Sequence, residues 1–201
     1  MGFLNEKCTL TPYTKEIIAN CEPFDCDHDD LNDFFCNDVE NYSSELLGKT
    51  YCFTLDEDPS VIVCAFTISN DSIKTTFLPN NRKKKVNKSI PNEKRMRSYP
   101  AVLIGRLGVH KDYRKIEGED NISKQLMDFI KSWFIDKRNK TGCRFIVVDS
   151  YNEDRALNYY QNNNFVFLFS TEDQEREFTN RPVGYNLDTR LLYFDLIVLT
   201  K

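Results

Sequence analysis

Two adjacent tyrosines have the residue type and setting to act as an acid. Tyr159 and Tyr160 lie in the stretch ALNYYQNNNF, and neighbouring side chains on a helix point to different sides. A phenol carries its proton at neutral pH, so a tyrosine fixed by a rigid helix can work as a general acid. We take Tyr160 as the candidate; the alternative is that these rings only pack in the core.

The second candidate is the turn over 114–123, which leads from an apolar segment into an amphipathic helix. Backbone N–H groups and the helix dipole converge where such a helix begins, and a diphosphate binds well there. Arg114 and Lys115 add positive charge at the same place. The turn also holds three carboxylates, Glu117, Glu119 and Asp120.

Other reactive side chains have simpler explanations. Cys21, Cys26 and His28 lie close in sequence, but their spacing is not that of a zinc knuckle, so we expect core cysteines before a helix and no metal. Asp71 could act as a base through a water, although an aspartate in a turn is the commoner explanation. His110 is expected at the surface. No general base is identified.

The periodicity of apolar residues predicts the elements that position these groups. Expected helices cover 29–47, 121–134 and 154–162; expected strands cover 51–55, 61–69, 99–109, 144–148, 165–169 and 191–199, with a polar loop over 171–188. The first two strands form a hairpin. Strands that alternate with helices in the second half imply parallel pairing there. The prediction is one mixed α/β (α+β) domain over 1–201.

Composition bounds the class of protein. The 201 residues are 40% hydrophobic and 29% charged, which is typical of a globular domain. An odd count of 7 cysteines and a short, mixed N-terminal stretch favour the reducing cytoplasm. Apolar runs such as 101–104 are far too short to span a bilayer, so we expect no membrane. The net charge of −4 argues against a general nucleic-acid binder.

One segment departs from this acidic balance. Residues 79–98 have almost no apolar content and two basic clusters, at 82–85 and 94–97. We expect an exposed loop inserted in the domain. A solvated insertion is one interpretation, and an arm for an acidic substrate or a nucleic-acid backbone is the other.

The middle of the chain resembles the GNAT superfamily of acetyl-CoA-dependent N-acetyltransferases. The run GRLGV at 105–109 is similar to the central strand of that family, the turn over 114–123 to its pyrophosphate loop, and 148–152 and 159–165 to its later strand and tyrosine-bearing helix. The resemblance implies a strongly twisted sheet, flanked by helices, in which the central strands splay to admit the cofactor. The family pattern has glycines where this chain has Asn121 and Ser123; Gly118 remains.

The resemblance implies roles for particular residues. Tyr160 would protonate the departing thiolate of coenzyme A. The cofactor would contact the strand at Leu107, Gly108 and Val109, the turn at Arg114, Lys115, Asp120, Asn121, Ile122 and Ser123, and the side chain of Asn152. The alternative for Asn152 is a helix N-cap.

The expected function is therefore transfer of an acetyl group from acetyl-CoA to a primary amine, by direct attack in a ternary complex. The amine belongs to a small molecule or a peptide, and a homodimer is compatible with the sequence. Two alternatives stay open. One is a degenerate member that binds a partner; the other is a toxin-type acetyltransferase acting on aminoacyl-tRNA, because the Gly105-Arg106-Leu107 start resembles those members and the basic loop could hold nucleic acid.

Overall fold

The computed structural model describes residues 2–118 and 121–200. Within these ranges the chain forms two compact units, each discontinuous in sequence. Unit 1 comprises residues 1–69 and 104–132, and unit 2 comprises residues 70–103 and 133–201. The expectation of a single domain over 1–201 stays a prediction.

Strands of the described chain follow the order β1-β2-β3-β4-β5-β7-β6 in one sheet. Their bounds are β1 Cys8–Pro12, β2 Lys49–Leu55, β3 Ile62–Lys74, β4 Ser98–Val109, β5 Phe145–Tyr151, β6 Val166–Phe167 and β7 Thr189–Asp195. Strands β1 and β2 pair antiparallel, as do β2 and β3. The mixed α/β sheet flanked by helices and the early hairpin are confirmed. The splay of the central strands stays a prediction.

The parallel pairing expected between the later strands is wrong for β5 and β6. Strand β7 lies between them in the sheet and pairs antiparallel with both. The physical reason is that the last strand inserts between two earlier ones, and the alternation of strands and helices along the chain carries no signal for such an insertion.

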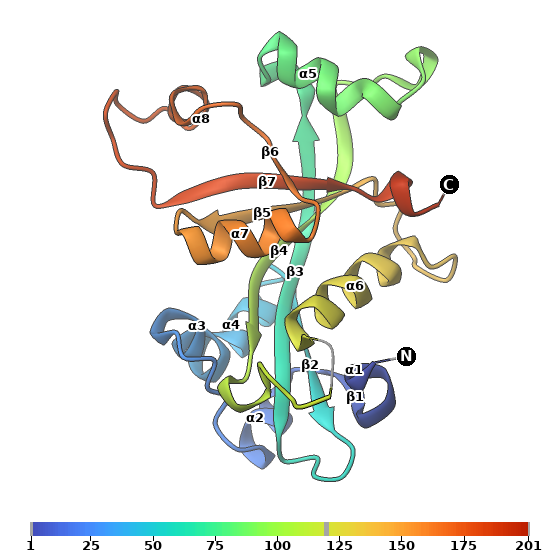
Figure 1. Cartoon of the computed structure of the whole chain (residues 1–201), viewed down its shortest axis with the longest axis vertical. Coiled ribbons are helices and arrows are strands. Elements are labelled where there is room, and N and C mark those ends of the chain that lie inside the picture. The colour runs from blue at the N-terminus through green and yellow to red at the C-terminus, as the bar shows by residue number, and fades with distance from the viewer. Residues whose placement is uncertain (1, 119–120, 201) are drawn as a thin grey trace. The chain divides into compact units, whose positions relative to one another are not determined.

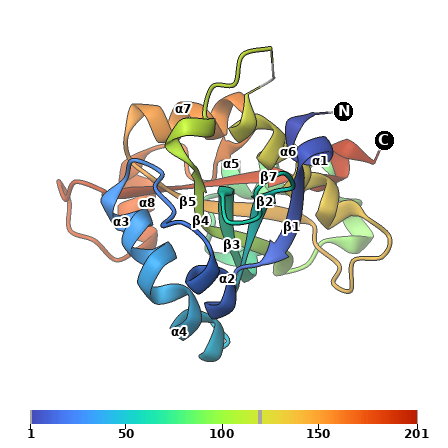
Figure 2. The ribbon, with the colours of Figure 1, turned by 90° about the horizontal axis from the view of Figure 1, so that it is seen from below.

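In unit 1 the helical segment over 29–44 contributes aromatic side chains to the core. Figure 2 shows the backbone of this segment. The helices are α1 (Phe3–Lys7), α2 (Lys15–Asn20), α3 (Asp29–Asp33), a π-helical turn η1 (Phe34–Asp38), α4 (Val39–Ser44), a 3-10 turn η5 (Lys111–Tyr113) and most of α6 (Ile122–Ile135). Phe35 is fully buried, with its ring 5.2 Å from that of Phe24. On α6, Phe129 lies 4.9 Å from the Phe53 ring, which fixes the helix against β2.

Unit 2 contains the β5-β7-β6 part of the sheet (Figure 1). Its other elements are η2 (Thr75–Phe77), α5 (Asn80–Val86), η3 (Asn87–Ser89), η4 (Asn92–Lys94), α7 (Asp154–Asn162), α8 (Glu172–Phe178) and η6 (Leu196–Leu199). Its core includes Phe145 and Phe169, both fully buried. No helix in either described range is both long enough and apolar enough to cross a membrane.

The expectation of an exposed loop over 79–98 is wrong, because the segment contains helix α5 and two 3-10 turns. Val86 and Ile90 are 1% and 7% exposed and join the core of unit 2. Helix α5 buries Arg82 and Val86, which lie four positions apart on one face, while its three lysines stay exposed.

Candidate functional site

The start of α6, in unit 1, is capped by the side chain of Asn121. Its Oδ1 atom accepts hydrogen bonds from the backbone N–H of Ser123 at 2.9 Å and from that of Lys124 at 3.4 Å. The Ser123 hydroxyl donates to the same oxygen at 2.5 Å. These are the N–H groups that an anion would use at a helix N-terminus. Ile122, the first helical residue, is fully buried.

The two cations expected in the turn differ in their surroundings. The Arg114 guanidinium pairs with Asp27 at 3.2 Å and donates to the carbonyl oxygen of Cys26. Lys115 is exposed, and no ion pair involves it within residues 2–118 and 121–200. Gly118 has φ of +79°, a conformation that glycine adopts without strain. Asp120 lies outside the described residues.

The strand residues expected to face the cofactor sit at the end of β4. Val109 is buried, Leu107 is half-buried, and Gly108 lies beneath the segment containing Phe24 and Cys26. A Cβ at Gly108 would lie 3.1 Å from the Phe24 ring, so a glycine lets this segment approach the strand closely.

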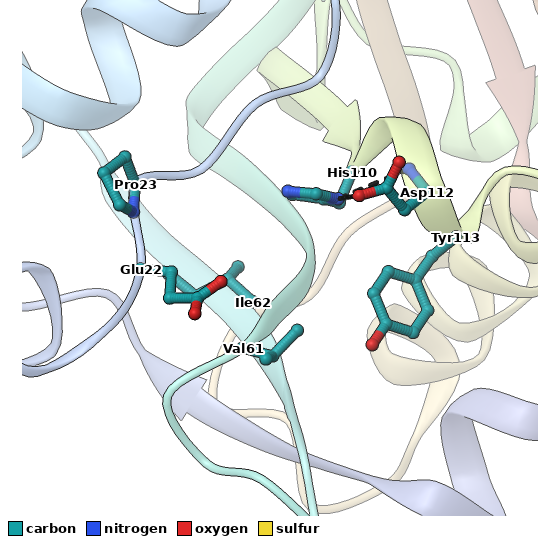
Figure 3. Close-up of a pocket in the computed structure, with 7 residues that line it drawn as sticks. All are labelled: Glu22, Pro23, Val61, Ile62, His110, Asp112 and Tyr113. Atoms are coloured by element: carbon teal, nitrogen blue, oxygen red, sulfur yellow. Dashed lines mark hydrogen bonds and ion pairs between the residues drawn. The ribbon is translucent and has the colours of Figure 1, made fainter.

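A pocket of about 390 Å³ opens beside the residues that follow strand β4 (Figure 3). Its walls come from Glu22, Pro23, Val61, Ile62, His110, Asp112 and Tyr113. The His110 side chain is 17% exposed, with Nδ1 3.7 Å from the Asp112 carboxylate. Its ring lies 6.0 Å from those of Phe24 and Tyr113. His110 is therefore partly enclosed by aromatic rings. The two carboxylates of the wall, Glu22 and Asp112, disfavour an anion in this pocket.

Unit 2 contains Tyr160, on the last turn of α7. The Tyr160 carbonyl accepts the N–H of Phe165 at 3.0 Å, and Asn164 between them has φ of +64°, so the helix ends in a tight left-handed turn. The Tyr160 ring lies 5.1 Å from Tyr159 and 5.5 Å from Phe165. Burial raises the pKa of the Tyr160 phenol well above its ordinary value of 10.0. The phenol is therefore neutral, and able to donate a proton, across the physiological range.

Asn152 is held by a network that the sequence did not reveal. Its Nδ2 atom donates to the Leu187 carbonyl at 2.9 Å and lies 3.5 Å from the Glu172 carboxylate. The N-cap residue of α7 is Glu153, so the capping role considered for Asn152 is wrong. Glu172 also lies 3.4 Å from Arg190, whose Nε donates to the buried Glu175 at 2.7 Å. This network ties α8 to β7, and residues about twenty positions apart in sequence give no spacing signal for it.

The remaining candidates have structural roles. His28 Nδ1 accepts the N–H of Leu31 at 3.4 Å and caps α3. Asn32 accepts from the Cys26 backbone N–H at 2.8 Å, and no group of three metal-binding side chains forms among the described residues. Asp71 is exposed within β3 and accepts the N–H of Ser72. Asp71 lies in a strand, so the turn considered for it is wrong.

The fold is similar to that of solved bacterial toxins. No protein-family model matches the sequence, and no curated protein matches it significantly. AtaT complexed with acetyl-methionyl-tRNAfMet has a TM-score of 0.63 at 18% identity, with 96% of this chain and 97% of that chain covered. A tyrosine-to-phenylalanine variant of KacT gives 0.62 at 16% identity, with 97% and 98% covered. AtaTR bound with AcCoA gives 0.60 at 18% identity, with 98% and 99% covered.

AtaT and KacT have the GNAT fold. This chain has the GNAT fold. The recognition made from GRLGV and the tyrosine-bearing helix is thereby confirmed at the level of the fold. The GNAT residues expected to contact a cofactor fall in unit 1, except Asn152, which lies with Tyr160 in unit 2.

Proposed function

We propose that this chain is an acetyl-CoA-dependent N-acetyltransferase whose acceptor is the amino group of an aminoacyl-tRNA. The observation that carries the proposal is the near-complete GNAT fold, with a TM-score of 0.63 to AtaT complexed with acetyl-methionyl-tRNAfMet. The toxin-type acceptor was an alternative at the level of the sequence. It now has better support than a small-molecule or peptide amine, because the similar solved structures are toxins.

Several residues of unit 1 support binding of the diphosphate of acetyl-CoA. Helix α6 is 14 residues long, so its dipole favours an anion at the N-terminus. Lys115 is an exposed cation next to this end, and Gly118 lets the backbone turn sharply. The Asn121 cap opposes binding of the diphosphate, because a phosphate must displace the Asn121 oxygen to reach the N–H groups of Ser123 and Lys124. We therefore propose a weaker diphosphate site than a glycine-rich turn would form.

Arg114 would act indirectly in this proposal. Its guanidinium is engaged by Asp27 and by the Cys26 carbonyl, so it positions the turn after β4. Leu107, Gly108 and Val109 would present strand backbone to the amide-rich pantetheine arm. The Asn152 amide would have to release the Leu187 carbonyl before it could donate to a cofactor.

Tyr160 would supply the proton in the transfer step. The acceptor amine attacks the thioester carbonyl carbon, a C–N bond forms, and the C–S bond breaks. The leaving sulfur takes a proton from the Tyr160 hydroxyl, and the amine loses one to the solvent or to a base not yet identified. A neutral phenol suits this task, and its raised pKa keeps it neutral. Structures of AtaT and of KacT with tyrosine-to-phenylalanine substitutions are similar in fold to this chain.

The decisive experiment follows acetyl groups from radiolabelled acetyl-CoA. The protein is incubated with aminoacyl-tRNA, with uncharged tRNA, and with free amino acids and small polyamines. We expect label in aminoacyl-tRNA only. Label in the small amines alone would reject the acceptor, and no label with any of them would reject the enzyme.

A binding protein without catalysis is the second candidate, and one observation favours it. The Asn121 side chain already satisfies the helix N–H groups that the proposed cofactor needs. Isothermal titration with millimolar acetyl-CoA separates the two candidates. Heat of binding with no acetyl transfer indicates a degenerate member, whereas absence of both removes the cofactor as well.

A further inference from the structure

An exposed set of cations covers helix α5 and the turns that follow it in unit 2. Residues 80–97 hold eight of the 27 basic residues of the chain and one of its 31 acidic ones. Seven of these cations are exposed: Lys83, Lys84, Lys85, Lys88, Lys94, Arg95 and Arg97. We call these seven residues the basic surface. None of them forms an ion pair with any carboxylate that the structure describes.

The eighth cation anchors the helix that carries the basic surface. Arg82 is 7% exposed, and its guanidinium donates to the carbonyl oxygens of Phe167 and Leu168, the latter at 2.7 Å. At the other end of the segment, the N–H of Thr75 donates to the Arg97 carbonyl at 2.8 Å. Ser89 donates to Asp195 at 2.9 Å. The lysines therefore project from a backbone that is tied to the sheet at several points.

A groove with two exposed aromatic rings adjoins the start of α5. Its volume is about 720 Å³, and its walls are Lys74, Phe77, Leu78, Pro79, Gln174, Glu177 and Phe178. Phe77 is 66% exposed and Phe178 is 42% exposed. Pro79 lines the groove and is also the N-cap residue of α5. The groove and the basic surface are thus continuous along the chain.

We propose that the groove and the basic surface together bind single-stranded RNA, with a base against Phe77 or Phe178 and the phosphates along the basic surface. This inference rests on the proposed function, since it gives the RNA acceptor a binding surface. Exposed cations beside an aromatic groove match a strand whose backbone is anionic and whose bases are flat and apolar on their faces. A duplex keeps its bases stacked inside and cannot fill the groove in this way.

One residue of the groove, Glu177, opposes binding of single-stranded RNA and so provides a specific test of the proposal. Glu177 is exposed and lines the groove together with Phe77 and Lys74, so its carboxylate repels a phosphate bound there. Glu177→Gln removes the charge and keeps the side-chain size. We expect it to tighten RNA binding severalfold, which a groove built for a cationic peptide would not show.

Fluorescence anisotropy with a labelled single-stranded RNA of about ten nucleotides, a length within the range that such surfaces cover, measures the binding directly. The triple variant Lys83→Ala, Lys84→Ala, Lys85→Ala should reduce the slope of log K against log salt by about 2, because each lost phosphate contact to a single strand removes about 0.7. Phe77→Ala should weaken binding roughly tenfold and leave that slope unchanged, because stacking carries no counterion release.

A matched control removes three exposed lysines elsewhere, Lys15→Ala, Lys49→Ala and Lys140→Ala. The inference is overturned if this control weakens binding as much as the α5 variant does, or if duplex RNA of equal length binds as tightly as the single strand. It is also overturned if RNA fails to bind while an acidic peptide does, which would make the surface a protein interface. Circular dichroism confirms that each variant is folded.

The binding assay contains no acetyl-CoA, so it fails independently of the proposed function. RNA binding without acetyl transfer supports this surface and removes the enzyme. Acetylation of tRNA that is unaffected by the α5 variant supports the enzyme and removes this surface.

Discussion

Asn121 and Ser123 form a closed cap at the first turn of α6: the Asn121 Oδ1 atom accepts from both the backbone N–H and the hydroxyl of Ser123, at 2.9 and 2.5 Å. This cap occupies two positions where the GNAT pattern has glycines. The side chain that stabilises the helix thus competes with any anion for the same donors.

Replacing Asn121 by glycine should tighten acetyl-CoA binding. The freed N–H groups can donate to a phosphate, which we expect to improve the binding free energy by about 1 kcal/mol. Loss of the cap to glycine should lower the free energy of unfolding by only a few tenths of a kcal/mol. Isothermal titration measures the first quantity and urea denaturation the second. Asn121→Asp is the matched control, because it keeps the cap and adds a negative charge that should weaken binding. Weaker binding by Asn121→Gly would mean that Asn121 itself contacts the cofactor.

Tyr160→Phe should lower kcat by roughly 100-fold or more, since a positioned general acid contributes at least that much. The dissociation constant of acetyl-CoA should stay within about twofold of wild type, because the ring and its packing against Phe165 remain. Steady-state kinetics and titration give the two values. Tyr159→Phe is the control and should retain near wild-type turnover. Equal kcat in the two variants would remove Tyr160 from the mechanism.

The Tyr160 phenol should remain protonated, and able to act as the general acid, below pH 10. Burial raises the pKa of the Tyr160 phenol above 10.0, so the proton stays on the oxygen throughout the neutral and mildly alkaline range. We therefore expect that ionisation of Tyr160 causes no loss of kcat up to about pH 9. Any decline in that range should also be present in Tyr160→Phe. A decline near neutral pH that is missing from this variant would assign Tyr160 a lowered pKa and contradict the burial argument.

Lys131→Met should stabilise the protein at neutral pH. Lys131 is 5% exposed on α6, and burial lowers its pKa from 10.5 to about 8. Between these two values the unfolded chain binds more protons than the folded one, so wild-type stability rises as the pH rises from about 8 toward 10.5. Removing the charge should add about 1–3 kcal/mol at pH 7 and abolish that rise. Urea denaturation at several pH values checks both effects. Lys124→Met, on the exposed face of the same helix, should change neither by more than about 0.5 kcal/mol.

Arg82→Met should destabilise the protein by about 2–4 kcal/mol. It leaves the carbonyl oxygens of Phe167 and Leu168 without the guanidinium that binds them. Arg82→Lys should recover part of the loss, because one ammonium replaces a two-donor contact. Thermal denaturation gives the ranking of the three proteins. Lys84→Met, on the exposed side of α5, is the control, and an equal loss there would attribute the effect to helix propensity.

The local sequence pattern was enough to predict an element whose structure depends mainly on its own residues. Helix α7 has the predicted bounds, because its apolar residues repeat at helical spacing and Asn164 ends it in a left-handed turn. Helix α5 was missed because its lysines hid a buried face of only Arg82 and Val86. The sequence contains a start signal for helix α8, within the segment 171–188 that was expected to be a polar loop. Thr171 and Gln174 form the capping pattern S/T-x-x-E/Q, and Thr171 caps the Gln174 N–H at 3.3 Å.

Long-range partners of the site could not be predicted from spacing. The Asn152 amide meets the Leu187 carbonyl across 35 positions of the chain, and Arg114 meets Asp27 across 87. Both contacts depend on which elements fold side by side, and the order of β5, β7 and β6 shows that chain order does not decide this. The residue types therefore indicated which groups could form the site, but their hydrogen-bond and ion-pair partners could be identified only from the structure.

The interleaving of the two units bears on how the protein emerges from a ribosome. The N-terminal 69 residues are only part of unit 1, which is completed by residues 104–132. Strand β4 therefore has to be synthesised before unit 1 can close, and the final strand β7 must appear before β5 and β6 gain their shared partner. Neither unit is built from one continuous segment, so we expect unit 2 to complete its fold only after residues 133–201 have been synthesised.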